Sequence, residues 1–292
     1  MAACSASLGD VARGANPCCG AAVSRRALVL LATACACLPP PKPPDLGADP
    51  AAALAQVQAG QAAVQRVQGE ARTRVRSPQG GGSVRQFLAA EKPDRLHLEV
   101  LDFFGNPALV LVTGDGRFAL LDARQKVLYR GRATPANLAR LVPLPLPAED
   151  LVTLVCGGAP LLAGRPVQLA TQGSNVVLTV EGDGTVERLR LGEGARVEQA
   201  DREVAGGAGP GSYTVKLGDR TRRAGLWFPD RVELRSDPAR VQFGLEWTEV
   251  ELNGALDPKL FELAPPRGAR VVEVGEQDPP PVIEVPAQKD AG

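Results

Sequence analysis

The sequence has few of the residues from which enzyme active sites are most often built. Its 292 residues include one histidine, one methionine and two tryptophans, and aromatic residues make up 4% of the chain. A Ser-His-Asp or Cys-His catalytic arrangement would have to use His97, which lies beside Glu99 on the polar side of an expected strand. A solvated strand histidine accounts for this position better, and we expect no catalytic residues.

The sequence also lacks an excess of either charge. Lysine and arginine together number 33, aspartate and glutamate also number 33, and the formal net charge is zero. Because binding to nucleic acid is driven by a basic surface, we expect no nucleic-acid partner. There is no Cys-x-x-Cys pair or histidine-rich tract, and no Gly-Lys-Ser/Thr follows the glycines at 80–82, so we expect no metal or other cofactor.

The apolar run near the N-terminus is too short to cross a bilayer and instead resembles the core of a secretory signal peptide. Arg25 and Arg26 precede the run 27–34, which ends at Cys35. Small residues before a cysteine resemble a lipobox, the signal for cleavage before that cysteine and its lipidation. We therefore interpret 1–35 as a signal peptide with a lipobox-like end, and Cys35 as the lipidation site.

Other interpretations of this region stay open. The residue three before Cys35 is Ala32 rather than the usual leucine, and Cys37 is a second candidate acceptor. An ordinary cleaved signal without a lipid also fits, and the segment 24–28 resembles a twin-arginine export signal. Ala36 follows Cys35 where aspartate would favour retention in the inner membrane, so we expect a lipid-anchored protein at the periplasmic face of the outer membrane.

Three cysteines would be left after cleavage. If Cys35 carries the lipid, Cys37 and Cys156 could form a disulfide in an oxidising compartment. Alternatively, Cys156 is a small, buried apolar residue near the end of a helix.

Composition divides the rest of the chain into a tether, one folded domain and a tail. The segment 36–49 is rich in proline and should be extended, as a membrane tether needs to be. The pair 49–50, Asp-Pro, supplies an N-cap and a first-turn proline for a helix over 51–67. We assign 50–274 to the folded domain and 275–292, which is polar and proline-rich, to a disordered tail.

Apolar residues alternate with a period of two over many short segments of the domain, which is typical of antiparallel strands. Two short helices interrupt them, one over 136–141 and one that ends at Gly157. The longest strand, 241–252, changes phase, and a β-bulge near Thr248 would restore its register. This order predicts an α+β fold with one large, curved antiparallel sheet of about ten or eleven strands and few helices.

Two adjacent phenylalanines, Phe103 and Phe104, precede Gly105 at the end of a strand. The Gly-Asn-Pro sequence that starts at Gly105 ends the strand, so a loop is expected here. The two rings either fold back into the core or protrude to meet a membrane or an apolar partner.

The stretch 95–158 carries a distinctive order of elements. An apolar strand leads to the Phe-Gly loop, strands with a Gly-Asp-Gly turn follow, and then come the segment 136–141, a Pro-Leu-Pro-Leu-Pro bend and a helix that ends in Gly-Gly. This pattern resembles the LolB-like outer-membrane lipoproteins, which are related to the periplasmic carrier LolA. The resemblance extends over 51–261 in the order of elements but is specific only over 95–158. The long tail and the aromatic loop depart from the pattern.

The resemblance implies an incomplete β-barrel whose concave face is capped by helices, with an apolar cavity for the acyl chains of lipoproteins. It implies that the protein receives lipoproteins from a LolA-type carrier and delivers them to the inner leaflet of the outer membrane. Phe103, Phe104 and Gly105 would form the membrane-insertion loop. The cavity would be lined by Leu96, Leu98, Val100, Phe118, Leu120, Val127, Tyr129, Leu138, Leu141, Leu151 and Leu154.

The same hydrophobic pattern also allows a filled core without a cavity. In that case the chain would be an exported structural or interaction lipoprotein of the same fold that binds a protein partner and no lipid. An exported hydrolase is disfavoured because the sequence has no histidine network or nucleophile motif. We expect a monomer.

Overall fold

A computed structural model describes residues 44–78, 80–139, 146–205 and 211–275, all of which belong to one compact unit. The expected signal peptide, Cys35, Cys37, Leu141 and the tail beyond Gly275 lie outside the described residues.

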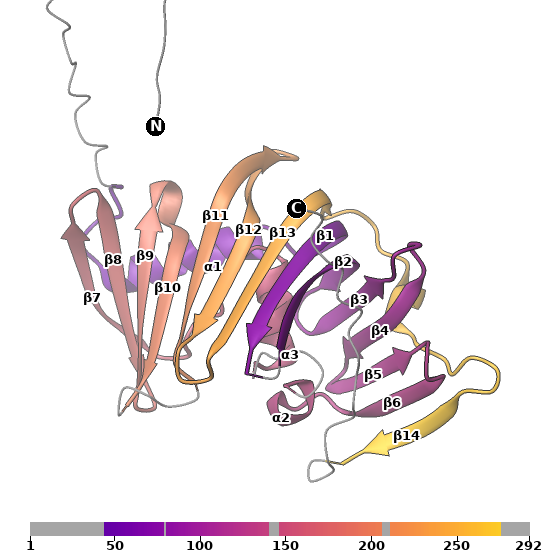
Figure 1. Ribbon diagram of the computed structural model, residues 1–292. Helices are drawn as coiled ribbons and strands as arrows, with labels where there is room; N and C mark the ends of the chain where they lie inside the picture. Colours follow the sequence, from indigo (N-terminus) through magenta and orange to yellow (C-terminus); the bar gives the residue numbers. More distant parts are fainter. Residues whose placement is uncertain (1–43, 79, 140–145, 206–210, 276–292) are drawn as a thin grey trace, which may run out of the picture. The chain divides into compact units, whose positions relative to one another are not determined.

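Fourteen strands form a single open sheet in the order β14-β6-β5-β4-β3-β2-β1-β13-β12-β11-β10-β9-β8-β7 (Figure 1). Neighbouring strands are antiparallel, except that β14 is parallel to β6. Because β7 and β14 are edge strands that do not pair with each other, the sheet is an incomplete barrel, as expected. The bounds are β1 Arg66–Ser77, β2 Gly80–Glu91, β3 Arg95–Leu101, β4 Pro107–Gly114, β5 Arg117–Asp122, β6 Val127–Arg132, β7 Arg165–Gln172, β8 Asn175–Gly182, β9 Thr185–Gly192, β10 Arg196–Val204, β11 Tyr213–Arg223, β12 Leu226–Ser236, β13 Val241–Leu252 and β14 Arg270–Val274.

The strand count exceeds the expected ten or eleven because apolar alternation did not reveal β9, β10 and β14. Strands β9 and β10 carry charged residues at many positions, and one of these, Glu187, is fully buried. Strand β14 has no fully buried residue, and only Val272 and Val274 pack, partly buried, against the core. Its backbone pairs with β6, and so short and exposed a strand gives little apolar alternation to detect.

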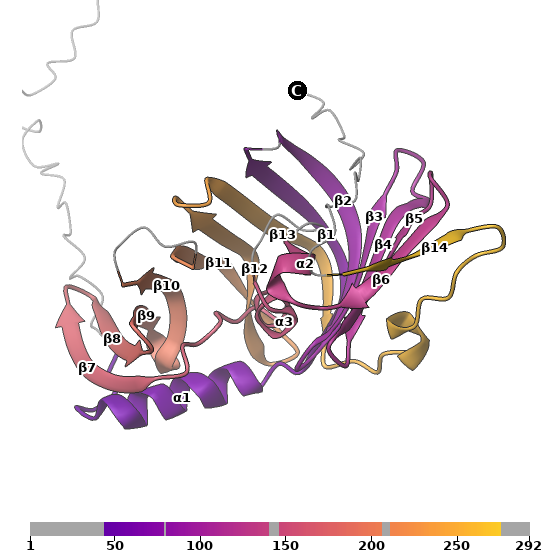
Figure 2. The same ribbon diagram turned by 90° about the horizontal axis from the view of Figure 1, so that it is seen from below.

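The described helices lie on one face of the sheet. Helix α1 (Pro50–Ala62) packs on β7, β8 and β10, and α3 (Ala148–Val155) packs on β2 and β3. Figure 2 shows α1 running along β7 to β10, and α2 (Pro135–Leu138) with α3 inside the curve of the sheet. Two 3-10 turns, η1 (Glu193–Ala195) and η2 (Pro258–Phe261), complete the elements. None of the described helices is long and apolar enough to span a membrane.

Helix α1 begins as expected but ends earlier. The Asp49 carboxylate accepts a hydrogen bond from the N–H of Ala51, as an N-cap does. The helix ends at Ala62, five residues before the expected end, because the Asn253 side chain fixes the turn into β1. Its Oδ1 accepts from the N–H of Gln65 at 2.8 Å, and its Nδ2 donates to the carbonyl of Ala63 at 2.8 Å.

The bulge expected near Thr248 is present in the pairing of β1 with β13. Glu70 pairs with Glu249 and Ala71 with Trp247, so Thr248 has no partner on β1. The extra residue returns the end of β13 to the phase that faces the core, as the sequence pattern requires.

Gly69 makes this bulge possible and provides a test of it. A Cβ on Gly69 would lie 2.1 Å from the carbonyl oxygen of Glu249, and its φ is +156°. We expect Gly69→Ala to lower the free energy of unfolding by about 1–3 kcal/mol, because backbone must shift to admit the methyl group. Urea denaturation would measure the change.

Gly244 on β13 is the matched control, because a Cβ there meets nothing within 4 Å. Gly244→Ala should be neutral or stabilise the fold by about 0.5–1 kcal/mol, since glycine weakens a strand interior. Equal losses for the two variants would contradict the steric account of the bulge.

Candidate functional site

The expected acyl-binding residues gather on the face of the sheet that the helices cover. Ten of the eleven lie in the described part of the chain, and Leu98 packs against the main core without being fully buried. Val100 belongs to a small cluster with Val84 and Leu109, against which Leu98 also packs. The other eight are buried in the main core, namely Leu96, Phe118, Leu120, Val127, Tyr129, Leu138, Leu151 and Leu154.

On this face the described side chains of the helices pack against those of the sheet. Leu138 of α2 is 0% exposed and Leu154 of α3 is 2% exposed, and both belong to a core that continues to Val57 of α1. An apolar ligand would therefore have to displace the helices from the sheet before it could contact the strands.

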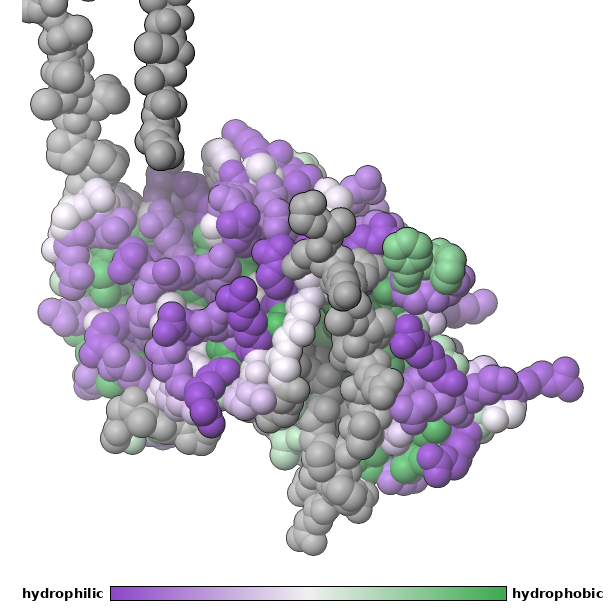
Figure 3. All heavy atoms as spheres, viewed as in Figure 1, coloured by the Kyte–Doolittle hydropathy of each residue, from purple (hydrophilic) through white to green (hydrophobic). Residues whose placement is uncertain are grey.

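The loop between β3 and β4 projects two aromatic rings into solvent. Phe103 and Phe104 are each 84% exposed, and their centroids lie 5.6 Å apart in an edge-to-face arrangement. The alternative that the rings fold back into the core is therefore wrong. Figure 3 shows a hydrophobic patch at this loop, and the rest of the face in view is largely hydrophilic.

Asp102 organises this loop. Its Oδ1 accepts hydrogen bonds from the N–H groups of Phe104 and Asn106, both at 2.9 Å. The bond from the Asn106 backbone is the main cause that lowers the pKa of the Asp102 carboxyl. Gly105 has a φ of +84°, which glycine adopts readily and phenylalanine does not. The loop is thus closed by its polar atoms, and its two apolar side chains are left outside.

His97 is buried rather than solvated, which corrects the expectation from its strand position. Its exposure is 6%, because η2 crosses the sheet over it. Nδ1 lies 2.5 Å from the carbonyl oxygen of Leu260, and Nε2 lies 2.8 Å from Oε1 of Glu99. Both ring nitrogens are engaged: the contact with Leu260 holds η2 to β3, and Glu99 lies on β3 itself, so the role of His97 here is structural.

Cys156 is buried at 3% exposure, just after the end of α3. Burial raises the pKa of its thiol to about 12, although the nearby Lys92 acts in the opposite direction. These properties fit the interpretation of Cys156 as a small core residue. Among the described residues, no group of three or more His, Cys, Asp or Glu side chains could hold a metal ion.

A buried ion pair fixes the chain that leaves α3. Glu187 on β9 is 0% exposed, and its Oε1 accepts from the Arg202 guanidinium at 2.9 and 3.1 Å. Its Oε2 accepts from the N–H of Leu162, while Arg202 also donates to the carbonyl of Pro160. Arg202 lies 4.0 Å from Asp150 of α3. Burial raises the pKa of the Glu187 carboxyl, and the Arg202 charge opposes this.

Removing one partner of this pair should be costly. We expect Glu187→Gln to lower the free energy of unfolding by about 3–5 kcal/mol, because it leaves Arg202 buried with less compensation. The control is Glu203→Gln on the neighbouring strand, since Glu203 forms an exposed pair with Arg188 at 2.8 Å. That change should cost about 1 kcal/mol or less. Denaturant unfolding of both variants would measure the difference, and similar values would contradict the assigned role.

The sequence analysis did not identify one cluster of basic side chains. Arg72, Arg74 and Arg76 alternate along β1 and line a groove of about 680 Å³ with residues of β10 to β13. The alternation is visible in the sequence, but the strands that complete the groove lie more than 120 residues further along the chain.

No family model matches the sequence, and no curated protein matches it. Several solved structures are similar to it in fold, including these two. A domain from Vibrio parahaemolyticus, named for outer membrane lipoprotein sorting, is 11% identical with a TM-score of 0.53 and covers 73% of this chain and 97% of its own. A LolA superfamily protein from Nitrosomonas europaea is 10% identical with a TM-score of 0.52 and covers 72% and 97%. The chain therefore has a LolA-like fold.

Proposed function

We propose that this protein is a lipid-anchored envelope protein that binds the acyl chains of lipoproteins and helps to place them in the outer membrane. The Phe103–Gly105 loop supports this most directly. Two phenylalanines at 84% exposure leave apolar surface in water that burial would stabilise by about 1.5–3 kcal/mol for each ring. Because the loop is closed by Asp102 and not by these rings, a membrane interface is their proposed environment.

The acyl chains would bind between the helices and the sheet. If α2 and α3 move away, Leu138 and Leu154 separate from the strands and expose an apolar surface on each side. Each methylene buried there contributes about 0.8 kcal/mol, so a long acyl chain could offset much of the lost packing. No catalytic group is needed for such binding.

The proposed anchor and the loop can reach the same membrane. A lipid on Cys35 would be followed by the proline-rich tether 36–49, which spans up to about 45 Å when extended. This length allows the folded domain to turn its β3–β4 loop toward the bilayer. A LolA-type carrier would present the cargo from the periplasm.

The packing of the described helices on the sheet favours the second candidate function. An exported lipoprotein of this fold could use the Phe103–Phe104 patch to bind an apolar surface of a partner protein. It would bind no lipid as a ligand. The two functions differ in whether an acylated cargo binds at all.

A transfer assay separates these functions. A soluble form beginning after Cys37 would be mixed with an acylated lipoprotein bound to its periplasmic carrier, and the partition of cargo would be followed with liposomes present. We expect Phe104→Glu to accept cargo but to release it into liposomes much more slowly, because a carboxylate disfavours entry into the membrane interface.

Trp227→Glu is the matched control, because Trp227 is an exposed aromatic residue, at 47%, on another hairpin. It should transfer cargo as the unchanged protein does. If neither cargo nor free lipid binds to the unchanged protein, the proposed acyl-binding function is wrong. The binding of a partner protein then remains as the proposed function.

A further inference from the structure

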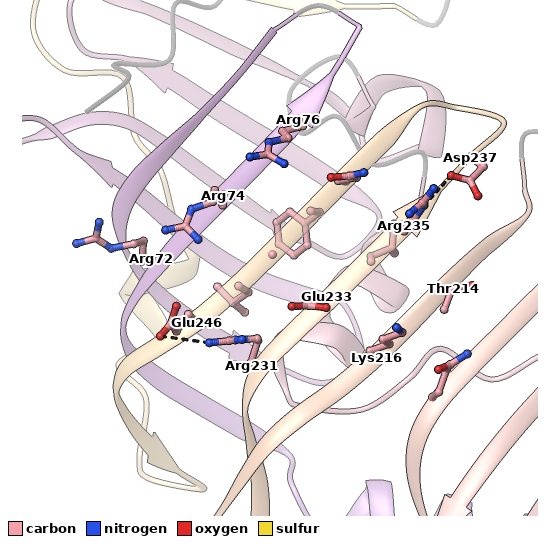
Figure 4. Close-up of a pocket in the computed structure, with 16 residues that line it drawn as sticks. Arg72, Arg74, Arg76, Thr214, Lys216, Arg231, Glu233, Arg235, Asp237 and Glu246 are labelled. Atoms are coloured by element: carbon pink, nitrogen blue, oxygen red, sulfur yellow. Dashed lines mark hydrogen bonds and ion pairs between the residues drawn. The ribbon is translucent and has the colours of Figure 1, made fainter. Parts of the chain in front are cut away.

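A groove lies on the face of the sheet opposite the helices. In β1, Ala71 and Thr73 point to the core, so the exposed arginines between and beyond them point to the other face. Figure 4 shows these side chains with those of β11, β12 and β13 around the groove. The groove holds three carboxylates, Glu233, Asp237 and Glu246, and six cations, Arg72, Arg74, Arg76, Lys216, Arg231 and Arg235.

The groove has a floor and two basic walls. Gly244 of β13 lies in the floor, paired with Arg74 on one side and Glu233 on the other, and a Cβ there would meet nothing within 4 Å. The arginines of β1 form one wall, and the cations of β11 and β12 form the other. Two strand spacings separate β1 from β12, which is about 10 Å. A small anionic group in the floor could therefore be contacted from both sides.

Several of the cations form no ion pair in the described part of the chain, although Glu233 lies directly opposite Lys216. Arg235 pairs with Asp237 at 2.7 Å, and Arg231 pairs with Asp219 at 3.2 Å. In contrast, Arg74, Arg76 and Lys216 form no ion pair with any residue in the described part of the chain.

The pairing of β1 accounts for only part of this row of arginines. Arg72 is directly opposite Glu246 of β13, but it is also directly opposite Arg85 of β2, and like charges in that relation destabilise a sheet. Elsewhere, Arg223 at the end of β11 is held by Asp230 at 2.7 Å, so its charge has a structural partner.

The basic groove and the aromatic loop share one end of the sheet. Arg76 lies just before the hairpin that joins β1 to β2. Since β1, β2 and β3 alternate in direction, the loop after β3, which carries Phe103 and Phe104, is at the same end as this hairpin. An anionic surface in contact with the Phe103 and Phe104 rings would also lie near the end of the groove that contains Arg76.

We propose that this groove binds the phosphate-bearing headgroups of anionic lipids at the membrane surface that the loop contacts. The guanidinium group of arginine binds phosphate in a bidentate manner, and its charge does not titrate. Basic and apolar contacts together give firmer membrane association than either alone. Headgroup binding rests on the proposed membrane contact of the loop but not on acyl-chain binding.

Vesicle co-sedimentation tests the proposal with the chain that begins after Cys37, which retains every described helix and strand. One set of vesicles would contain phosphatidylglycerol and phosphatidylcholine, and the other only phosphatidylcholine. Each basic residue near an anionic bilayer strengthens binding about fivefold, so Arg74→Gln/Arg76→Gln should weaken binding to anionic vesicles about 25-fold. Binding to neutral vesicles should be unchanged.

The control is Arg117→Gln/Arg267→Gln, which removes two exposed arginines outside the groove and changes the net charge equally. It should have little effect on either kind of vesicle. If it weakens anionic binding as much as the groove variant does, net charge alone governs the binding and the proposed site is wrong.

Gly244→Val provides a second test that does not alter charge. The side chain would fill the floor of the groove, while a β-branched residue suits a strand interior better than glycine. We expect the free energy of unfolding to be equal or higher and anionic vesicle binding to be weaker. Unaltered binding by a folded Gly244→Val protein would overturn the headgroup site.

Two further outcomes distinguish headgroup binding from the apolar contact of the loop and from recognition of acidic protein segments. Phe104→Glu should weaken binding to neutral and anionic vesicles alike, whereas the groove variants should affect only anionic vesicles.

If a glutamate-rich peptide binds in the groove and anionic vesicles do not, the groove recognises acidic protein segments and the lipid proposal fails. The cargo-transfer assay is independent of both results.

Discussion

The pairing of β1 with β13 is the constraint on which the rest of the sheet depends. Strands β1 to β6 follow one another in sequence and in space, and so do β7 to β13. Each run is a meander built from local hairpins, and only the contact between β1 and β13 joins the two into one sheet. The bulge at Thr248 and the glycine at position 69 belong to this contact, and they show how closely its geometry is specified.

This joint gives the sheet two faces with different chemistry. On one face the apolar residues of both meanders share a core with the helices, and the buried pair of Glu187 and Arg202 holds the chain after α3 against the second meander. On the other face the arginines of β1 meet the polar side chains of β11 and β12 across Gly244. The core is continuous across both meanders, and the groove is complete only where they meet.

Local features of the fold could be predicted from the sequence because local physics determines them. The Asp-Pro start of α1, the meander through 129 and the phase change at Thr248 all follow from residues close together in the chain. The LolA-like fold was also identifiable, from the order of elements over 95–158.

The remaining features depend on distant contacts. The burial of His97 requires Leu260, which is 163 residues away, and the end of α1 requires Asn253. The exposure of Phe103 and Phe104 depends on which other segments pack over the end of the sheet. A hydrophobic pattern in the sequence does not give that information. The arginines of β1 form a groove only because β13 and β12 return beside them.

The long sequence separation between β1 and β13 also affects when the protein can fold. Strand β1 begins at Arg66 and its partner β13 ends at Leu252, so the joint closes a loop that includes most of the domain. Closing so large a loop carries an entropic cost before any contact compensates for it, and folds of high contact order form slowly. Nearly the whole chain must be synthesised before the two halves can be united. A chain with this topology therefore stays without its complete sheet through most of its synthesis, and its two meanders remain separate until β13 is available.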